Sequence, residues 1–349
     1  MTHRIDRRTL LRGAASTGAV SLSPIPAIAQ GKTLVAATFP DMWSVLHRGI
    51  LAAAFVNASG DSVKQPAIYG TEQLKQLING KGARPPFDVA LFNSLHVPEA
   101  VNRGLIAEYP IAQSPNYPDL LPRFQDKWGP CITVSVMGIG YNPKSMTAPP
   151  KNWDELSATK FKGRIGLIAP TTILGVTFLA ELNRLKGGTE DDFEPAFKAL
   201  RALLPNVGGI AANSEAFDML WQREQIDIAP HDFNRVQTLK TRGIPVELAM
   251  PESGKVGWLT TMHLVADATE PGLAVKYIDL HLDRAVQAEM QLSEFRIVPT
   301  NSKVKLEGLV AQVVARDPED FGKIRSFDWT KLYLQREALI ERFNREIKL

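Results

Sequence analysis

The sequence predicts an α/β protein made of two lobes. Short apolar runs of strand length alternate along the chain with stretches in which apolar residues recur at helical spacing. Such alternation is typical of parallel sheets that helices cover on both faces. The 349 residues are about the length of two domains, and 44% of them are hydrophobic, which is enough to bury a core in each lobe.

Each element rests on its own local signal. Thr71 is a suitable N-cap for a helix that ends at the glycines of 80–82, and Asn152 with Glu155 has the pattern of a capping box. The expected strands are 33–38, 87–92, 132–141, 163–168, 226–229, 246–250 and 258–265. The other expected helices are 43–55, 97–105, 177–185, 193–203, 214–223, 273–282 and 285–292, with helix again after Pro299.

Residues 1–29 are typical of a twin-arginine signal peptide. Arg7 and Arg8 lie in a cationic stretch, a small and weakly apolar run follows at 13–22, and 27–29 offers the small residues that a signal peptidase requires. The run is too short to span a membrane. An ordinary secretory signal that happens to contain paired arginines is the alternative, and both routes lead to the periplasm.

The charge of the remaining chain is balanced. Of 40 basic and 37 acidic residues, the expected signal peptide holds four and one, so 36 of each sign remain. A neutral body without a basic tract argues against nucleic acid as a partner. Cys131 is the only cysteine, so no intrachain disulfide can form. We expect a soluble periplasmic monomer.

Sequence motifs of common enzyme classes are missing. The sequence has no nucleophile elbow, no His-Glu-x-x-His, no Cys-x-x-Cys and no phosphate-binding Gly-x-x-x-x-Gly-Lys loop. Gly138-Ile139-Gly140 lacks the third glycine of a dinucleotide fingerprint and falls inside an expected strand. We therefore expect a protein that is not an enzyme and has no cofactor, with an exported hydrolase as the remaining alternative.

Several segments in order resemble the periplasmic solute-binding proteins of ABC importers. The similar branch contains the spermidine/putrescine, ferric-iron and thiamine binders, in extracellular solute-binding protein family 1. The resemblance extends over 33–349. The segments that carry it are PFDVAL (86–91) with RGLI (103–106), GIGYNPK (138–144), PKNWDEL (150–156) with FKGRI (161–165), Trp258 at a strand start, PGLA (271–274), VPTN (298–301) and FDW (327–329).

This resemblance implies a two-lobe periplasmic-binding-protein-like fold of the second type. The chain would cross between lobes near 131–136 and near 258–261. Lobe 1 would comprise 33–133 and 260–303, and lobe 2 would comprise 134–259 and 304–349. A small-molecule ligand would bind in the cleft between the lobes, which close around it, and the loaded protein would dock on the ABC permease.

Loops at the carboxyl ends of the strands supply the candidate ligand-binding residues, because ligands of open α/β sheets bind there. Aromatic side chains could stack on the ligand, and for Trp258 the resemblance implies this role. Thr71, Thr172 and Ser214 could cap helices that face an anion. The candidates are Phe39, Asp41, Tyr69, Thr71, Asn93, Ser94, His96, Thr171, Thr172, Ser214, Asp232, Trp258 and Thr260. Trp43, at helical spacing with Leu46, is expected in the core.

Departures from the family pattern bear on the ligand. Polyamine binders of this branch hold ammonium groups with acids in lobe 2 and after the stacking Trp, whereas 259–261 and 170–177 contain no acid here. Asp41 and Asp232 remain to hold a cationic group. We expect a small polar organic solute, with amine-bearing compounds included, such as a polyamine-, opine- or amino acid-like compound.

A metal-binding alternative uses the histidines. His96, His231 and His263 fall in or near the expected cleft, and imidazole with carboxylate suits a transition metal. The chain has no Tyr-Tyr pair of the kind that ferric binders present. A ferric-ion or metal-chelate binder is therefore the second hypothesis, and no residue is assigned as a metal ligand. His47 and His281 are expected at the surface or partly packed.

Overall fold

The computed structural model describes residues 31–347, and from Lys32 onward the chain forms one compact unit with the expected two-lobe α/β architecture. The expected signal peptide lies outside the described residues. The strands are β1 (Thr33–Val35), β2 (Ser62–Lys64), β3 (Val89–Asn93), β4 (Cys131–Tyr141), β5 (Ile165–Ile168), β6 (Val207–Ala211), β7 (Ile228–Asp232), β8 (Glu247–Ala249) and β9 (Val256–Leu264).

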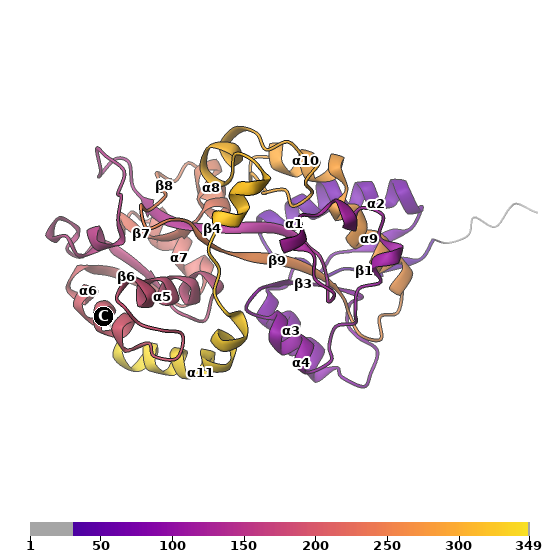
Figure 1. The fold of residues 1–349 in the computed structure, drawn as a ribbon, viewed down its shortest axis with the longest axis horizontal. Helices are drawn as coiled ribbons and strands as arrows, with labels where there is room; N and C mark the ends of the chain where they lie inside the picture. The colour runs from indigo at the N-terminus through magenta and orange to yellow at the C-terminus, as the bar shows by residue number, and fades with distance from the viewer. Residues whose placement is uncertain (1–30, 348–349) are drawn as a thin grey trace, which may run out of the picture. The chain divides into compact units, whose positions relative to one another are not determined.

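Helices cover both lobes (Figure 1). They are α1 (Met42–Leu46), α2 (Ala52–Ser59), α3 (Gly70–Asn79), α4 (Val97–Asn102), α5 (Ile173–Leu185), α6 (Glu194–Leu203), α7 (Ser214–Gln222), α8 (Phe233–Thr241), α9 (Pro271–Leu282), α10 (Arg284–Leu292) and α11 (Trp329–Glu346). A π-helical turn, His47–Leu51, joins α1 to α2. The expected capping box of Asn152 and Glu155 is present, but it starts a short 3-10 helix, Trp153–Ser157.

The main sheet is mixed, not parallel as the alternation predicts. Within residues 31–347 it has seven strands, in the order β3-β9-β4-β7-β5-β6 with β8 paired to β4. β9 is antiparallel to β3 and β4, and β4 is antiparallel to β7, while β5 pairs in parallel with β6 and β7. Because β4 leads from one lobe to the other and β9 leads back, these two neighbours run in opposite directions.

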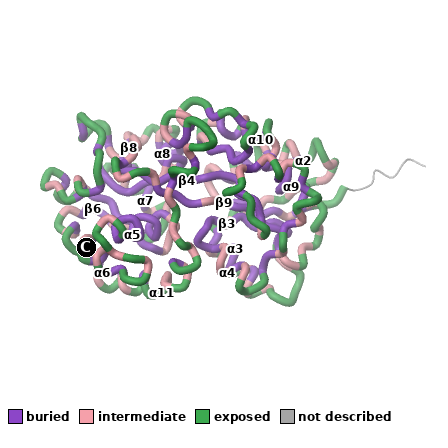
Figure 2. The backbone as a smooth tube through the Cα atoms, in the orientation of Figure 1, coloured by how far each residue is buried: buried purple, intermediate pink, exposed green. Residues whose placement is uncertain are grey.

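β4 and β9 connect the lobes (Figure 1). Along β4, Val136 packs in the core of one lobe and Met137 in the core of the other. Along β9, Trp258 packs in the second core and Met262 in the first. Both strands are buried over nearly their whole length, as Figure 2 shows, so they form a continuous buried connection between the lobes.

Two main hydrophobic clusters define the lobes used below. The first lobe has its core around β3, α2 and α9, and the second has its core around β5, α5 and α7. Residues 304–324 depart from the expected boundaries: Val310 and Phe321 pack in the first cluster, although 304–349 is expected in lobe 2. Only from α11 onward, with Leu332 and Leu339, does the chain pack in the second cluster.

Glycines allow the strands to approach closely around β4. A Cβ atom on Gly138 would lie 2.6 Å from the carbonyl oxygen of Ala249 in β8, so a side chain there would displace backbone. The Gly-Ile-Gly segment therefore serves strand packing. Among residues 31–347, no helix has both the length and the apolar character needed to cross a bilayer.

Candidate functional site

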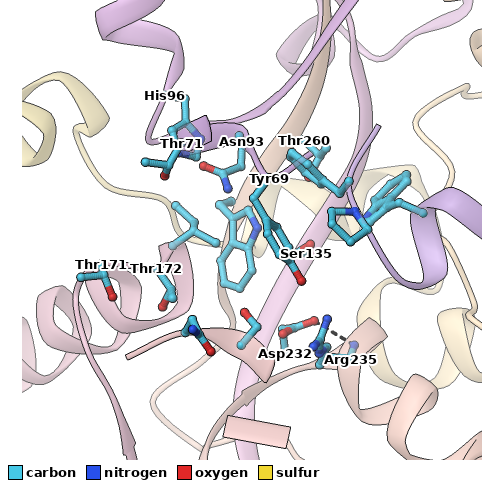
Figure 3. A pocket seen from close by; sticks show the side chains of 18 of the residues that line it. Tyr69, Thr71, Asn93, His96, Ser135, Thr171, Thr172, Asp232, Arg235 and Thr260 are labelled. Atoms are coloured by element: carbon cyan, nitrogen blue, oxygen red, sulfur yellow. Dashed lines mark hydrogen bonds between the residues drawn. The ribbon is translucent and has the colours of Figure 1, made fainter. Parts of the chain in front are cut away.

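A cavity of about 410 Å³ lies between the two lobes. Side chains of both lobes and of the connecting strands β4 and β9 form its wall (Figure 3). The volume lies in the range of about 300–1,000 Å³ that is usual for sites of small molecules. Eleven of the thirteen candidate residues line it, namely Phe39, Tyr69, Thr71, Asn93, His96, Thr171, Thr172, Ser214, Asp232, Trp258 and Thr260.

Local structure explains why these residues meet. Asn93 ends β3, and Asp232 ends β7 and caps α8, where its Oδ1 accepts a hydrogen bond from the backbone N–H of Arg235 at 2.9 Å. Thr172 caps α5 and accepts from the N–H of Gly175 at 3.1 Å. Strand ends and helix starts therefore converge on the cavity, as expected for an α/β fold.

Helices α3, α5 and α7 begin at this cavity. Gly70, Ile173 and Ser214, their first residues, all line its wall. The first N–H groups of an α-helix have no acceptor within the helix, and the helix dipole is positive at this end. This part of the wall therefore favours negatively charged or hydrogen-bond-accepting groups.

Asp41 does not line the cavity, which corrects the prediction for it. Its carboxylate faces α8 instead, with Oδ2 lying 3.1 Å from Nη1 of Arg235 and Oδ1 lying 3.7 Å from Nη2 of Arg242. The group is already ion-paired to two guanidinium groups. It is thus not free to hold a cationic part of a ligand.

Ser94 is the second candidate that does not line the cavity. Its Oγ accepts from the backbone N–H of Leu259 at 3.0 Å and lies 3.3 Å from the carbonyl oxygen of the same residue. The hydroxyl group thus ties the end of β3 to β9. Its role is structural because both of its hydrogen-bonding functions are used there.

Aromatic side chains form much of the apolar wall. Trp258 is 5% exposed and Tyr69 is 37% exposed, and both line the cavity together with Phe39. Trp43, expected only in the core, packs in the first cluster and also lines the cavity, where its ring meets that of Phe39 edge to face. The hydroxyl group of Tyr69 donates to Glu215 of the second lobe, and burial raises the pKa of this phenol.

The histidines do not assemble into a metal site. His96 lines the cavity, with Nε2 3.0 Å from Oγ1 of Thr71, and burial lowers its pKa to about 3. His263 lies away from the cavity, where its ring nitrogens contact Oγ1 of Thr261 at 2.7 Å and the carbonyl oxygen of Trp128 at 2.8 Å.

His231, the third histidine of the metal alternative, is buried between the rings of Phe217 and Trp221. Among residues 31–347, no group of three or more His, Cys, Asp or Glu side chains is placed to hold a metal ion.

The sequence reasoning missed several lining residues, among which Arg235 and Arg336 carry positive charge. Arg235 follows Asp232 by one helical turn, so the helix after β7 would have pointed to it. Arg336 comes from α11, more than one hundred residues after the loops of the second lobe, and no local signal marks it. The remaining missed polar residues are Ser135 and Glu215, and Asn213, in the expected cleft loop with Ser214, lines the wall as well.

Comparisons with known proteins agree with this architecture. A family model described as bacterial extracellular solute-binding protein matches residues 84–322. The spermidine/putrescine-binding periplasmic protein of Escherichia coli K12 is 22% identical over 282 residues, which are 75% of this chain and 77% of the relative.

Two solved structures show the same fold. A periplasmic binding protein from Actinobacillus pleuropneumoniae with fructose-6-phosphate bound has a TM-score of 0.72 and 19% identity, over 92% of this chain and 100% of that one. A spermidine/putrescine ABC transporter substrate-binding protein from Streptococcus pneumoniae has a TM-score of 0.72 and 17% identity, over 91% and 100%. With the family model spanning most of both lobes, the chain is a member of the bacterial extracellular solute-binding proteins, which bind solutes and are not enzymes.

Proposed function

We propose that this protein is the substrate-binding component of an ABC importer and captures a small polar organic solute that bears an amine. It works in the periplasm as a monomer and delivers the solute to the permease in the membrane. One observation carries this proposal: both lobes line a cavity of about 410 Å³, and a carboxylate group and aromatic side chains form part of its wall.

Asp232 is the group that would hold the amine. Its side chain is 15% exposed, and no arginine or lysine lies within ion-pair distance of its carboxylate in residues 31–347. One oxygen serves as the helix cap, which leaves capacity on the other. Tyr69 and Trp258 add aromatic faces, which attract an ammonium group and its methylene chain.

The walls disfavour a long polyamine. Among residues 31–347, Glu215 is the one carboxylate besides Asp232 that lines the cavity, and it already accepts a hydrogen bond from Tyr69. Arg336 also lines the wall, and its positive charge repels a chain of several ammonium groups. The relatives named for spermidine and putrescine support binding of an amine on this fold, and the relative with a bound sugar phosphate supports a wider range of solutes.

Closure of the lobes suits delivery to a permease. A ligand that contacts both lobes binds the closed state more tightly than the open one, and so it shifts the population toward the closed state. An importer that recognises the closed form then receives loaded protein in preference to empty protein.

The test is a thermal-shift and calorimetry screen on the mature protein, purified, unfolded and refolded to remove any carried solute. The panel holds polyamines, diamines, amino acids, opines, aminophosphonates, thiamine, and ferric iron with and without citrate. A ligand at 100 times its Kd adds about 2.7 kcal/mol, on the order of 5–10 °C in Tm.

We expect a shift with amine-bearing compounds and stoichiometric binding without turnover. A shift with iron alone that a chelator reverses would overturn the proposal in favour of a metal binder. A refolded protein that binds none of the panel, or that converts a compound chemically, would also contradict it.

A further inference from the structure

Arg336 differs from the other arginine in the cavity wall in its partners. Arg235 is 15% exposed and is neutralised by two carboxylates, Asp41 at 3.1 Å and Asp218 at 2.7 Å. For Arg336, residues 31–347 supply no carboxylate within 4.0 Å. Its Nη2 donates to the carbonyl oxygen of Thr171 at 2.9 Å, and its buried Nε has no acceptor in the same part of the chain.

The environment of Arg336 is short of negative charge. Burial lowers its pKa, and although Glu99 and Glu337 lie near enough to oppose that effect, neither pairs with it. A partly desolvated guanidinium group beside a cavity attracts an anion from the ligand, because its positive charge is otherwise uncompensated.

Neutral hydrogen-bonding groups surround this arginine. Thr171 and Thr172 lie at the start of α5, and His96 of the first lobe is 6% exposed, with a buried Nδ1 that has no hydrogen-bond partner among residues 31–347. Arg336 contributes to lowering the pKa of His96, so this imidazole stays neutral and adds no further cation. The result is one positive charge set among neutral groups.

The carboxylate group of Asp232 lies at the other end of the cavity. Figure 3 shows Thr71, His96, Thr171 and Thr172 on one side of the cavity and Asp232 on the other. The hydrogen bond to Thr171 places Arg336 on the former side. The cavity therefore has a positive end and a negative end, and a solute with one charge of each sign would neutralise both.

We propose that Arg336 forms a carboxylate subsite, so that the solute is an amino acid with its amine and its carboxylate at opposite ends of a carbon chain. The inference rests on the proposed function, in which the amine of the solute binds at Asp232. A single guanidinium group balances the single charge of a carboxylate, whereas a phosphate ester or phosphonate brings up to two charges. The planar guanidinium fork also matches the planar carboxylate group.

The experiment compares pairs of ligands that differ in one end group. Calorimetry compares the affinity for 4-aminobutyrate with that for putrescine, and the affinity for 5-aminovalerate with that for cadaverine. The affinities for 2-aminoethylphosphonate and α-amino acids are measured as well. For the native protein we expect the ω-amino acids to bind at least tenfold more tightly than the diamines. A tighter α-amino acid or phosphonate would overturn the proposed ligand class.

Arg336→Gln then tests the residue. We expect it to weaken the ω-amino acids roughly 10- to 100-fold, the effect of a lost hydrogen bond to a charged group, while the diamines bind equally or more tightly. Arg336→Lys, which keeps the charge, is expected to restore part of the preference. Arg342→Gln on the same helix is the control, because Arg342 pairs with Glu194 and Glu346 and does not line the cavity.

The two levels of the hypothesis fail differently. The subsite would be overturned if diamines bind as tightly as ω-amino acids and Arg336→Gln leaves the ratio of the two affinities unchanged. The proposed function would still stand in that case. No binding of any amine to the native protein would overturn the proposed function itself. Because Arg336 also donates to the Thr171 carbonyl group, circular dichroism and Tm are used to check the fold of each variant. If Arg336→Gln unfolds, the affinities of Arg336→Lys test the subsite instead.

Discussion

Oδ2 of Asp41 in the first lobe lies 3.1 Å from Nη1 of Arg235 in the second lobe, and Asp218 holds the same guanidinium group from its other side at 2.7 Å. Tyr69 and Glu215 make a second contact between the lobes. Asp41 has a φ of 59°, a backbone conformation that costs free energy in a residue other than glycine. The two contacts stabilise the arrangement of the lobes seen in this structure.

Asp41→Asn is expected to shift the protein toward the open state and to weaken solute binding roughly 2- to 10-fold. The variant removes one charge from a partly buried ion pair, while Arg235 keeps Asp218, so the loss is about 1 kcal/mol. Small-angle scattering of the ligand-free protein measures the opening and calorimetry the affinity. Glu108→Gln is the control, since its pair with Lys127 is exposed on both sides. Equal scattering profiles for Asp41→Asn and the native protein would contradict the role.

Asp232→Asn is expected to weaken an amine-bearing solute roughly 10- to 100-fold and to leave the unfolding free energy nearly unchanged. Asparagine caps helices as well as aspartate does, so it still accepts the N–H of Arg235. The negative charge facing the ammonium group is lost. Calorimetry with the best ligand of the screen measures the effect. The control is Asp328→Asn, the same change at the cap of α11, which is expected to bind the ligand with native affinity. If Asp232→Asn binds as tightly as this control, Asp232 does not contact the ligand.

The site was largely predictable where function and local structure use the same residue. Thr172 and Asp232 follow apolar strands and cap the next helices, so their position in the sequence predicts both the cap and the cleft. Asp41 has the same kind of position, but the sequence does not tell that its carboxylate turns toward two arginines. The sequence does not predict Arg336 as a lining residue, because only tertiary packing brings α11 to the cavity.

The fold shows the same limit. Apolar runs locate β4 and β9, yet strand direction depends on which lobe each strand enters, and alternation alone suggested parallel pairing. Phe321 likewise lies in a stretch with helical character that packs on the first lobe, and no local pattern specifies the partner of a helix. Local signals thus give the elements, and long-range packing gives their neighbours.

Tyr69→Ala is expected to weaken solute binding about tenfold with little change in stability, whereas Trp258→Ala is expected to impair both. Tyr69 is 37% exposed and Trp258 only 5%, and the indole ring also packs in the second core. Truncating a buried tryptophan costs about 3–5 kcal/mol of unfolding free energy. Urea denaturation and calorimetry at a temperature where both variants are folded separate the two effects. A stable Trp258→Ala protein with native affinity would place the ring outside the site.

Acidification is expected to destabilise the fold through His47 and His281, which are fully buried instead of lying at the surface as expected. Their ring centroids are 5.2 Å apart, and both ring nitrogens of His281 lack a hydrogen-bond partner within the described part of the chain. Burial lowers the pKa of His281 to about 4 and that of His47 well below its usual value, to which the His281 charge contributes. The unfolded chain, with an ordinary histidine pKa of about 6.5, therefore binds protons that the folded protein does not.

The unfolding free energy is therefore expected to fall as the pH decreases from about 6.5 toward 4, with a loss from His281 of about 2 kcal/mol at pH 5. His281→Phe keeps a buried ring without a titrating group and is expected to reduce this slope. Urea unfolding of both proteins at pH 7.5, 6 and 5 provides the measurement. His263 and His96, whose pKa values burial also lowers, remain in the variant, so part of the slope persists. A slope that His281→Phe leaves unchanged would show that its protonation does not limit stability in acid.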